Sequence, residues 1–236
     1  MGVTTLGTST KVLIVVTSHG QLGTTGNPTG YYLPEVAHPW AELRERGIEV
    51  DIASPLGGKA PMDPKSDDSP DKVTSAALAT KEFRTKLENT IPLSRAVASE
   101  YRAIVFAGGH GTMWDFPSHP DVNRLTREIF EKGGVVGAVC HGPAALVDVR
   151  LSDGSFLVAG RKVAAFSNAE EAAIKLTDVM PFLLETKLVS RGGVYSSAPL
   201  WQSHVVVDGR LVTGQNPASA TGVGAEVAKL LTGPKS

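Results

Sequence analysis

Short apolar runs and longer amphipathic segments follow one another along most of the chain. Largely apolar runs at 11–17, 103–107 and 135–139 are typical of parallel strands that are buried on both faces. An alternating pattern predicts another strand at 48–54, and a shorter apolar run predicts a fifth core strand at 163–166. Because helical segments separate most of these runs, the pattern favours βαβ units with right-handed crossovers.

The segments between the strands contain residues that are typical of helix ends. Pro34 precedes one segment and Gly47 follows it, as at the two ends of a helix. Ser167 is followed by Asn-Ala-Glu-Glu, a sequence typical of a capped helix start. Asp208-Gly209, between two apolar runs, predicts a β-hairpin. The expected helices are 35–46, 76–100 with a break near Ile91, 118–132 and 217–231.

These elements predict the architecture of the whole chain. Strands that alternate with helices form a parallel sheet with helices on both faces. We therefore predict an α/β fold with a three-layer, doubly wound, mostly parallel sheet of the flavodoxin-like type. No composition shift or linker marks an internal boundary, so we expect a single domain over residues 1–236.

The run 135–139 leads directly into Cys140, the only cysteine among the 236 residues, and small residues that can begin a helix follow it. A strand that turns sharply into a helix holds the turn residue above the edge of the sheet, as in the nucleophile elbow of hydrolases. A helix N-terminus favours a thiolate, so we expect Cys140 to have the lowest pKa in its pocket. His141 can supply a base. The alternative is a buried structural cysteine, which behaves as a small hydrophobe.

Loops that follow the other strands converge on this cysteine, because ligands bind beyond the carboxyl ends of an open parallel sheet. Catalysis by a thiol needs a proton acceptor and N–H donors for an oxyanion, and the backbone N–H groups of Gly109 and His141 are the expected donors. Glu35 and Glu170 are the nearby carboxylates. Each has another interpretation: Glu35 as a carboxylate stabilised by a helix dipole, and Glu170 as a capping residue or an ion-pair partner of Arg161 or Lys175.

Composition narrows the classes of function and of partner. The formal net charge is −1, from 23 basic and 24 acidic side chains. Nucleic-acid binding typically needs an excess of basic residues, so it is not expected here. No apolar run approaches the ~18–20 residues that span a bilayer, and no signal peptide is visible, so no membrane partner is expected. One cysteine forms no internal disulfide, which favours a reducing, cytoplasmic location.

Three motifs carry a specific resemblance: Gly-Gly-His-Gly-Thr-Met-Trp-Asp-Phe-Pro at 108–117, Ala-Val-Cys-His-Gly-Pro-Ala-Ala-Leu at 138–146, and Gly-Gln-Asn-Pro-Ala-Ser-Ala at 214–220. The chain resembles the heat-shock-chaperone branch of the class I glutamine-amidotransferase-like superfamily, which includes the glutathione-independent glyoxalases (glyoxalase III, D-lactate dehydratase). The resemblance extends from about residue 11 to the C-terminal helix. A glutaminase would need a late His-x-Glu pair, and the late His204 is followed by two valines.

The resemblance implies Cys140 as the nucleophile, His141 as its partner, Glu170 as the third triad member, and Glu35 as the acid in contact with the sulfur. It implies a cofactor-independent lyase that converts methylglyoxal or similar 2-oxoaldehydes to 2-hydroxy acids such as D-lactate, through a hemithioacetal on the cysteine. The alternatives are a stress-induced holdase chaperone with a redox-sensing cysteine and unfolded client proteins, or a cysteine hydrolase or peptidase. We expect a homodimer.

The remaining pocket residues are assigned from their positions in these motifs. The expected substrate-binding set comprises Gly108, Gly109, His110, His141 and Trp114. We expect no metal and no cofactor, because His110 together with His38 and Glu35 makes only a loose ligand set. Phe166 and Trp201 are interpreted as core or interface residues, although either could wall the pocket.

Overall fold

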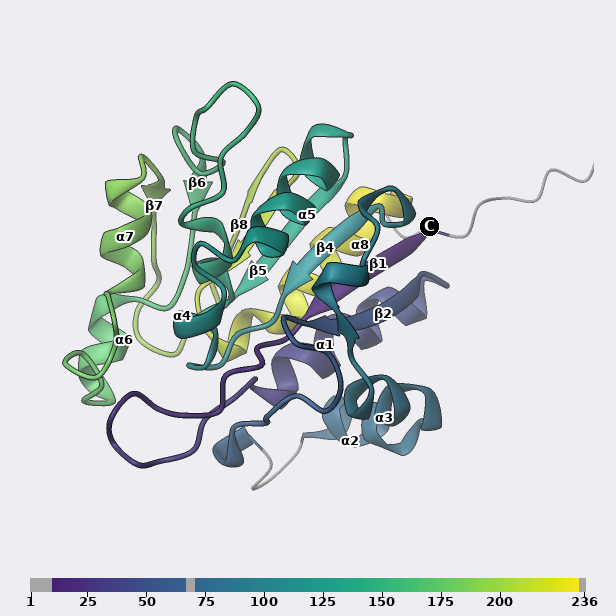
Figure 1. Cartoon of the computed structure of the whole chain (residues 1–236), viewed down its shortest axis with the longest axis horizontal. Coiled ribbons are helices and arrows are strands. Elements are labelled where there is room, and N and C mark those ends of the chain that lie inside the picture. Colours follow the sequence, from purple (N-terminus) through teal and green to yellow (C-terminus); the bar gives the residue numbers. More distant parts are fainter. Residues whose placement is uncertain (1–9, 67–70, 234–236) are drawn as a thin grey trace, which may run out of the picture.

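The computed structural model describes residues 10–66 and 71–233, and within them the central feature is a seven-stranded sheet (Figure 1). Neighbouring strands are parallel, except for the last pair, β9 and β8, which is antiparallel. The predicted α/β fold with a mostly parallel sheet is therefore confirmed. In spatial order the strands are β3 (Ile91–Pro92), β2 (Glu49–Ser54), β1 (Lys11–Val15), β4 (Ala103–Phe106), β5 (Val135–Val139), β9 (Leu211–Gly214) and β8 (Val205–Asp208).

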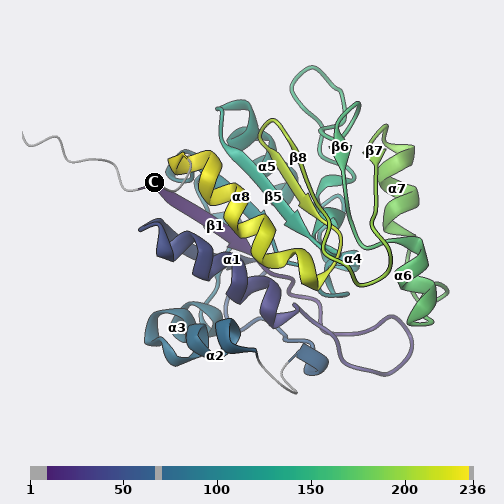
Figure 2. The ribbon, with the colours of Figure 1, turned by 180° about the vertical axis from the view of Figure 1, so that it is seen from behind.

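Helices cover both faces of this sheet. On one face α1 (Leu33–Glu45) and α8 (Ala220–Thr232) lie side by side against the strands (Figure 2), and on the other face α5 (Pro120–Glu131) packs on β4 and β5. The predicted helices at these three places are confirmed to within a few residues. The other α-helices are α2 (Lys72–Ala79), α3 (Lys81–Glu88), α4 (Thr112–Asp115), α6 (Asn168–Ala173) and α7 (Leu184–Ser190). The 3-10 helices are η1 (Pro64–Ser66), η2 (Leu93–Arg95), η3 (Ala98–Glu100), η4 (Gly142–Leu146) and η5 (Pro217–Ser219).

Two hydrophobic clusters, one on each face of the sheet, explain why the central strands are apolar at every position. In β1, Leu13 and Val15 belong to the cluster under α5, whereas Val12 and Ile14 belong to the cluster under α1 and α8. All four side chains are fully buried. Successive side chains of a strand point to opposite faces, so a strand covered on both sides needs no polar position.

The predicted fifth core strand at 163–166 is wrong. Only Lys162–Val163 forms a strand, β6, and it pairs with β7 (Val194–Tyr195) in a separate two-stranded sheet. The position beside β5 is occupied by β9, which comes from the C-terminal hairpin and pairs with β5 from Val136 to Val139. The predicted hairpin itself is confirmed: β8 and β9 pair across a turn at Gly209, which has a φ of 58°.

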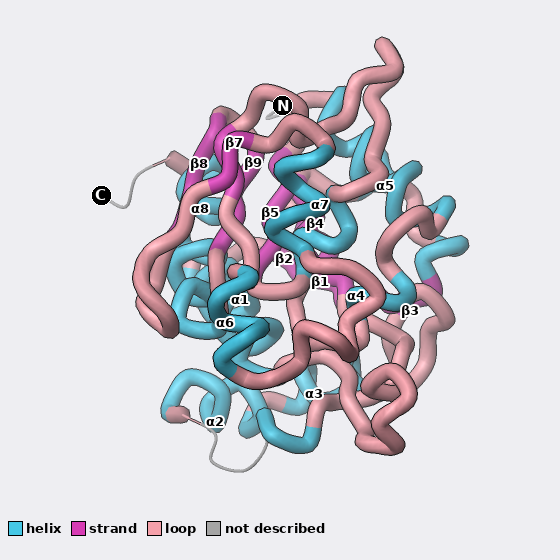
Figure 3. Tube along the Cα trace, turned by 90° about the vertical axis from the view of Figure 1, so that its left-hand side faces the viewer, coloured by secondary structure: helices cyan, strands magenta, loops and turns pink. Residues whose placement is uncertain are grey.

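The small sheet forms one side of the molecule together with two short helices. Figure 3 faces this side, where α6, α7 and β7 lie. None of the helices in 10–66 and 71–233 is long and apolar enough to cross a membrane. The expectation that no signal peptide is present concerns the first residues of the chain, of which 1–9 lie outside the described residues.

Candidate active site

A strained turn joins β5 to the short helix η4, and Cys140 occupies it. Cys140 has a φ of 60°, a left-handed conformation that non-glycine residues rarely adopt and that is concentrated at functional sites. The backbone approaches closely here, since a Cβ on Gly142 would lie 2.3 Å from the carbonyl oxygen of Phe106. The sequence-predicted elbow is therefore present. The helix after it is a five-residue 3-10 helix, shorter than the prediction assumed.

Cys140, His141 and Glu171 form a continuous hydrogen-bonded chain. The Cys140 Sγ lies 3.4 Å from His141 Nδ1, and His141 Nε2 lies 2.7 Å from Glu171 Oε2. All three residues are buried. An N–H on Nε2 donates to the carboxylate, which leaves the Nδ1 lone pair directed at the sulfur. This is the arrangement of a nucleophile, a base and a carboxylate that orients the base.

The assignment of Glu170 as the third member of this chain is wrong, because the neighbouring Glu171 holds the position. Consecutive residues of a helix point about 100° apart, so only one of the two glutamates faces His141. Glu170 is the N3 residue of a capping box: its Oε2 accepts from the Ser167 N–H at 3.0 Å and from the Ser167 hydroxyl at 2.9 Å. The interpretation of Glu170 as a capping residue is the correct one. The Ser-x-x-Glu spacing carried that signal in the sequence.

Glu35 lies against the sulfur and is fully buried. Its Oε2 accepts a hydrogen bond from the Gly108 N–H at 2.8 Å, and its carboxyl also interacts with the Cys140 thiol. Its Oε1 has no N–H donor among the described residues. Burial raises the pKa of Glu35 to about 8, although both hydrogen bonds oppose the shift. A carboxyl with such a pKa carries a proton at neutral pH, and the Cys140 sulfur is the group beside it.

The electrostatic environment of Cys140 differs from the prediction of a low thiol pKa. Burial raises the pKa of the Cys140 thiol, the charge of an ionised Glu35 raises it further, and only the N–H of His141 acts in the opposite direction. The neighbouring 3-10 helix has too few aligned peptides to supply the expected dipole. The thiol therefore keeps its proton until a base removes it.

His141 is suited to be that base. Burial and the neighbouring His110 lower the pKa of His141, so its ring is neutral at pH 7. Burial alone would raise the pKa of Glu171, but hydrogen bonds from His110 and His141 bring it down to about 2. The result is a neutral imidazole beside a permanent negative charge, which stabilises the imidazolium when it forms.

The loop after β4 supplies an N–H group to the same place. Gly109 has a φ of 100°, and a Cβ at this position would lie 2.2 Å from the Gly30 carbonyl oxygen, so no other residue fits. No acceptor for the Gly109 N–H is found among the described residues. The Gly108 N–H is engaged by Glu35. Of the two predicted loop glycines, Gly109 is therefore the one whose backbone N–H is available to donate to an oxyanion.

A cavity of about 530 Å³ opens above the thiol. Gly109, Cys140 and His141 lie at its base, and the rings of Phe166 and Trp201 are part of its wall. Phe166 packs on His141 with ring centroids 4.4 Å apart, and Trp201 follows at 6.0 Å from Phe166. Phe166 is a buried core residue, as interpreted, and also lines the cavity, whereas Trp201 is 48% exposed and its interpretation as a core residue is wrong. Another cavity, of about 680 Å³, is lined by other residues.

The predicted place of Trp114 in this pocket is also wrong. Trp114 is absent from the cavity lining and stacks on His19, with ring centroids 5.1 Å apart and planes inclined by 14°. It belongs to the short helix α4, and it packs partly buried against the core. The Gly-Gly-His-Gly motif places the loop correctly but leaves the direction of the Trp114 side chain, three residues after the motif, undetermined.

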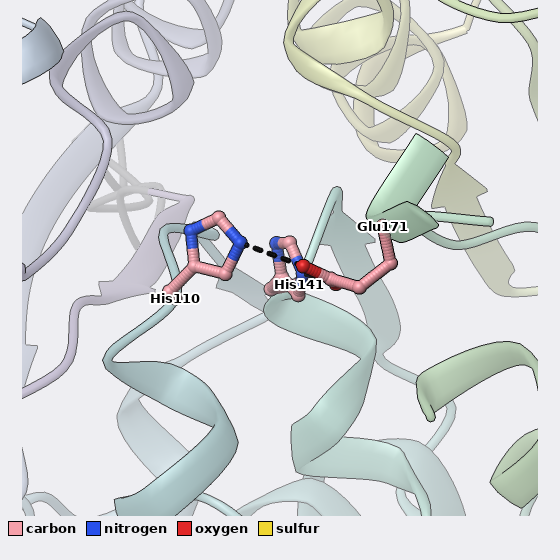
Figure 4. A group of neighbouring side chains, drawn as sticks. All are labelled: His110, His141 and Glu171. Atoms are coloured by element: carbon pink, nitrogen blue, oxygen red, sulfur yellow. Dashed lines mark hydrogen bonds and ion pairs between the residues drawn. The ribbon is translucent and has the colours of Figure 1, made fainter. Parts of the chain in front are cut away.

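His110 does line the cavity, as expected. Its Nε2 lies 3.1 Å from Glu171 Oε1, and its ring centroid lies 4.1 Å from that of His141. Figure 4 shows the two imidazoles directed at the one carboxylate. The three residues offer metal-ligating atoms within 4.8 Å of one another. Sequence reasoning missed this set because it assigned Glu170 in place of Glu171.

A cysteine at a strained strand–turn–helix junction, at the carboxyl edge of a mostly parallel sheet and beside a histidine and a buried glutamate, defines an α/β protein with a cysteine nucleophile elbow. The chain belongs to the DJ-1/PfpI family, which residues 29–230 match. Among curated proteins, the chain is 33% identical to glyoxalase 3 of Candida albicans over 222 residues, which cover 89% of this chain and 93% of that protein.

Other relatives agree with this assignment. The chain is 31% identical to the glutathione-independent glyoxalase HSP31 of Saccharomyces cerevisiae, with 89% of this chain and 93% of that one covered. The crystal structure of glyoxalase III from Candida albicans superposes with a TM-score of 0.87 at 30% identity, over 94% of this chain and 97% of that one. The 24 kDa rapid encystment protein of Francisella tularensis superposes with a TM-score of 0.91 at 41% identity, over 94% and 99%. The resemblance read from the three motifs is confirmed.

Proposed function

We propose that this chain is a glutathione-independent glyoxalase, which converts methylglyoxal or a similar 2-oxoaldehyde to the 2-hydroxy acid without a cofactor. The observation that carries the proposal is the position of Glu35. A buried carboxyl with a pKa of about 8 lies against the nucleophilic sulfur, on which an aldehyde carbon would be bound. A group with this pKa exchanges protons readily near neutral pH, and the reaction consists of moving a proton between two adjacent carbons. The glyoxalase relatives support the same activity.

The first step joins the substrate to the sulfur. The His141 Nδ1, 3.4 Å from Sγ, accepts the thiol proton while the sulfur attacks the aldehyde carbon. Glu171 stabilises the imidazolium that forms. The aldehyde oxygen becomes an oxyanion, which accepts a hydrogen bond from the Gly109 N–H and then the proton of Glu35. The product of this step is a hemithioacetal, and Glu35 is left as a carboxylate.

The second step is the proton transfer between carbons. The Glu35 carboxylate removes the hydrogen from the sulfur-bound carbon, and the His141 imidazolium protonates the neighbouring carbonyl oxygen, which gives an enediol. Glu35 then returns its proton to the second carbon, and His141 accepts the hydroxyl proton of the first. A thioester of the 2-hydroxy acid remains. In its hydrolysis the Glu35 carboxylate accepts a proton from water, the hydroxide attacks the thioester carbon, and the His141 imidazolium protonates the departing sulfur. This releases the 2-hydroxy acid and restores the thiol, the neutral imidazole and the protonated Glu35.

The proposal is tested first with the unmodified protein. Reduced protein that has been treated with a chelator, and that is assayed without glutathione, is expected to convert methylglyoxal to lactate, because no step above needs either. Formation of the 2-hydroxy acid is followed by NMR, and a chiral assay identifies the enantiomer. An absence of product from methylglyoxal, glyoxal and phenylglyoxal alike would overturn the proposal.

Glu35→Gln tests the carboxyl directly. The amide keeps the volume and the acceptor for the Gly108 N–H, but it transfers no proton, so turnover of methylglyoxal is expected to fall by ~10²-fold or more. In the wild type kcat/KM is expected to decline as pH rises through about 8, because the free enzyme needs the protonated acid. The kcat/KM of the variant should not show this decline. An unchanged rate or an unchanged pH profile would remove Glu35 from the mechanism.

The same carboxyl predicts a dependence of stability on pH. Its pKa is higher in the folded protein than in the unfolded chain, so the folded state binds the additional proton and unfolding becomes easier as pH rises from about 4.5 to about 8. Glu35→Gln removes this contribution. Thermal melts of the variant should therefore depend less on pH in this interval than those of the wild type.

The substrate class follows from the glyoxalase assignment, whereas other partners are further parts of the proposal. We propose a homodimer in a reducing, cytoplasmic compartment, built from one domain that spans residues 1–236. Unfolded clients belong to the alternative holdase role, and neither that role nor a hydrolase role explains a protonated carboxyl against the thiol. Size-exclusion chromatography with light scattering tests the assembly.

A further inference from the structure

One carboxylate shared by two imidazoles is the feature of this site that the proposed reaction does not fully use. The reaction requires His141 and its bond to Glu171 Oε2, at 2.7 Å. The second oxygen, Oε1, is held by His110 Nε2 at 3.1 Å. The His110 side chain is 16% exposed and reaches the cavity, whereas the side chains of His141 and Glu171 are 1% and 5% exposed. The set is thus buried but open to the cavity on one side.

The donors and their spacing suit a divalent transition-metal ion. Zn²⁺ takes imidazole nitrogen and carboxylate oxygen ligands at about 2.0–2.2 Å, which places the ligand atoms of a tetrahedral site about 3.3 Å apart. In this protein one ligating atom from each of the three residues lies within 4.8 Å of the others. The two carboxylate oxygens of Glu171 each face one imidazole, Oε2 at 2.7 Å from His141 Nε2 and Oε1 at 3.1 Å from His110 Nε2. Three protein ligands with the fourth position directed at a cavity is the usual form of an accessible zinc site.

We propose that His110, His141 and Glu171 form an inhibitory binding site for Zn²⁺ or a similar transition-metal ion. The inference rests on the proposed function, because inhibition presupposes that His141 is the base. A metal binds the lone pair of a neutral imidazole nitrogen. With Zn²⁺ on Nε2, the proton of His141 resides on Nδ1, the atom that lies 3.4 Å from the Cys140 sulfur. The lone pair that accepts the thiol proton is then lost, and the reaction does not start.

The same geometry separates the ligand set from the thiol. Cys140 lies against Nδ1 and the proposed ion against Nε2, on the other side of the imidazole ring. Binding should therefore survive removal of the sulfur. This distinguishes the proposed site from simple capture of a cysteine by a thiophilic metal, which needs the thiolate.

Isothermal titration calorimetry with ZnCl₂ tests the site independently of activity. The wild type is expected to bind one ion per chain. Cys140→Ser should keep this affinity within a few-fold, and His204→Gln, a matched control whose imidazole bonds Ser196, should also keep it. His110→Gln should weaken binding by at least ~10–100-fold, the loss caused even by removal of a metal site's outer hydrogen-bond partners. Glu171→Gln serves as a second ligand variant, and circular dichroism melts establish that each variant is folded.

Co²⁺ and an inhibition assay complete the test. Co²⁺ in the site should give visible absorption bands of a low-coordinate complex, without the sulfur-to-metal charge-transfer band of a thiolate ligand. Zn²⁺ should inhibit turnover reversibly, and its inhibitory concentration should rise by ~10-fold or more in His110→Gln, relative to that variant's own metal-free rate.

Several outcomes would overturn the metal site. They are no binding to the wild type, binding unaffected by His110→Gln and Glu171→Gln, or binding lost in Cys140→Ser. A wild type that binds Zn²⁺ as described but shows no turnover with any 2-oxoaldehyde overturns the proposed function and the inhibitory role, whereas the calorimetry still establishes the ligands. The failures of the two proposals are thereby distinguishable.

Discussion

Cys140→Ser is expected to reduce lactate formation from methylglyoxal to the uncatalysed background. Serine changes the volume of the buried side chain little, so the fold should be retained. Its hydroxyl is a far weaker acid than a thiol, and a neutral imidazole at the distance of His141 removes very little of its proton. The measurement is the rate of 2-hydroxy acid formation by NMR under reducing conditions, with thermal melts as the control for folding.

Suppression of client aggregation separates the enzyme from the chaperone alternative in the same variant. A holdase acts through exposed apolar surface, so it should be indifferent to a buried thiol. Lost turnover together with unchanged suppression would indicate two separable activities. Turnover that persists in Cys140→Ser would show that the sulfur is not the nucleophile and would contradict the mechanism.

Glu171→Gln is expected to lower kcat by ~10³-fold or more, by analogy with the amide replacement of the carboxylate in serine-protease triads. The carboxylate accepts hydrogen bonds from both His110 and His141, whereas an amide has one acceptor oxygen and no charge. It therefore neither orients both rings nor stabilises an imidazolium. Steady-state kinetics with methylglyoxal measure the effect.

The adjacent glutamate provides a matched control. Glu170→Gln removes the same charge one residue earlier, but this side chain caps α6 and bonds the Trp201 N–H at 3.0 Å and the Asn216 amide at 2.8 Å. Its main effect should be on stability, by ~0.5–2 kcal/mol as for other helix caps. If Glu170→Gln proved the more damaging to kcat, the assignment of Glu171 would be wrong.

The elbow at Cys140 and the glycine of the neighbouring loop could be predicted from the sequence. A run of apolar residues before Cys140 and small residues after it determine a strand, a turn and a helix, and each of these is local. Gly109 is equally local, because its left-handed backbone admits only glycine. Glu35 was placed through the family resemblance and lies at the sulfur.

Apart from the choice between Glu170 and Glu171, where the local Ser-x-x-Glu spacing carried the signal, the main errors depend on contacts between distant parts of the chain. The run 163–166 has the composition of a core strand, but β9 competes for the same edge of β5. Trp114 and Trp201 exchange their expected roles because the direction of a side chain in a loop is decided by its neighbours. The thiol pKa was predicted from a helix dipole alone, whereas burial and the nearby Glu35 determine it.

The position of β9 determines when, during folding, the active site is completed. The N–H of Cys140 donates to the carbonyl of Gly214 at 2.9 Å, so the strained turn is held by a strand that is synthesised more than seventy residues later. Contacts of such long range form late in folding. Until the ribosome releases the C-terminal hairpin, β5 is an edge strand and the Cys140 N–H lacks its acceptor in β9. In hydrogen exchange during refolding, the Cys140 amide should gain protection together with β9, and earlier protection would contradict this order.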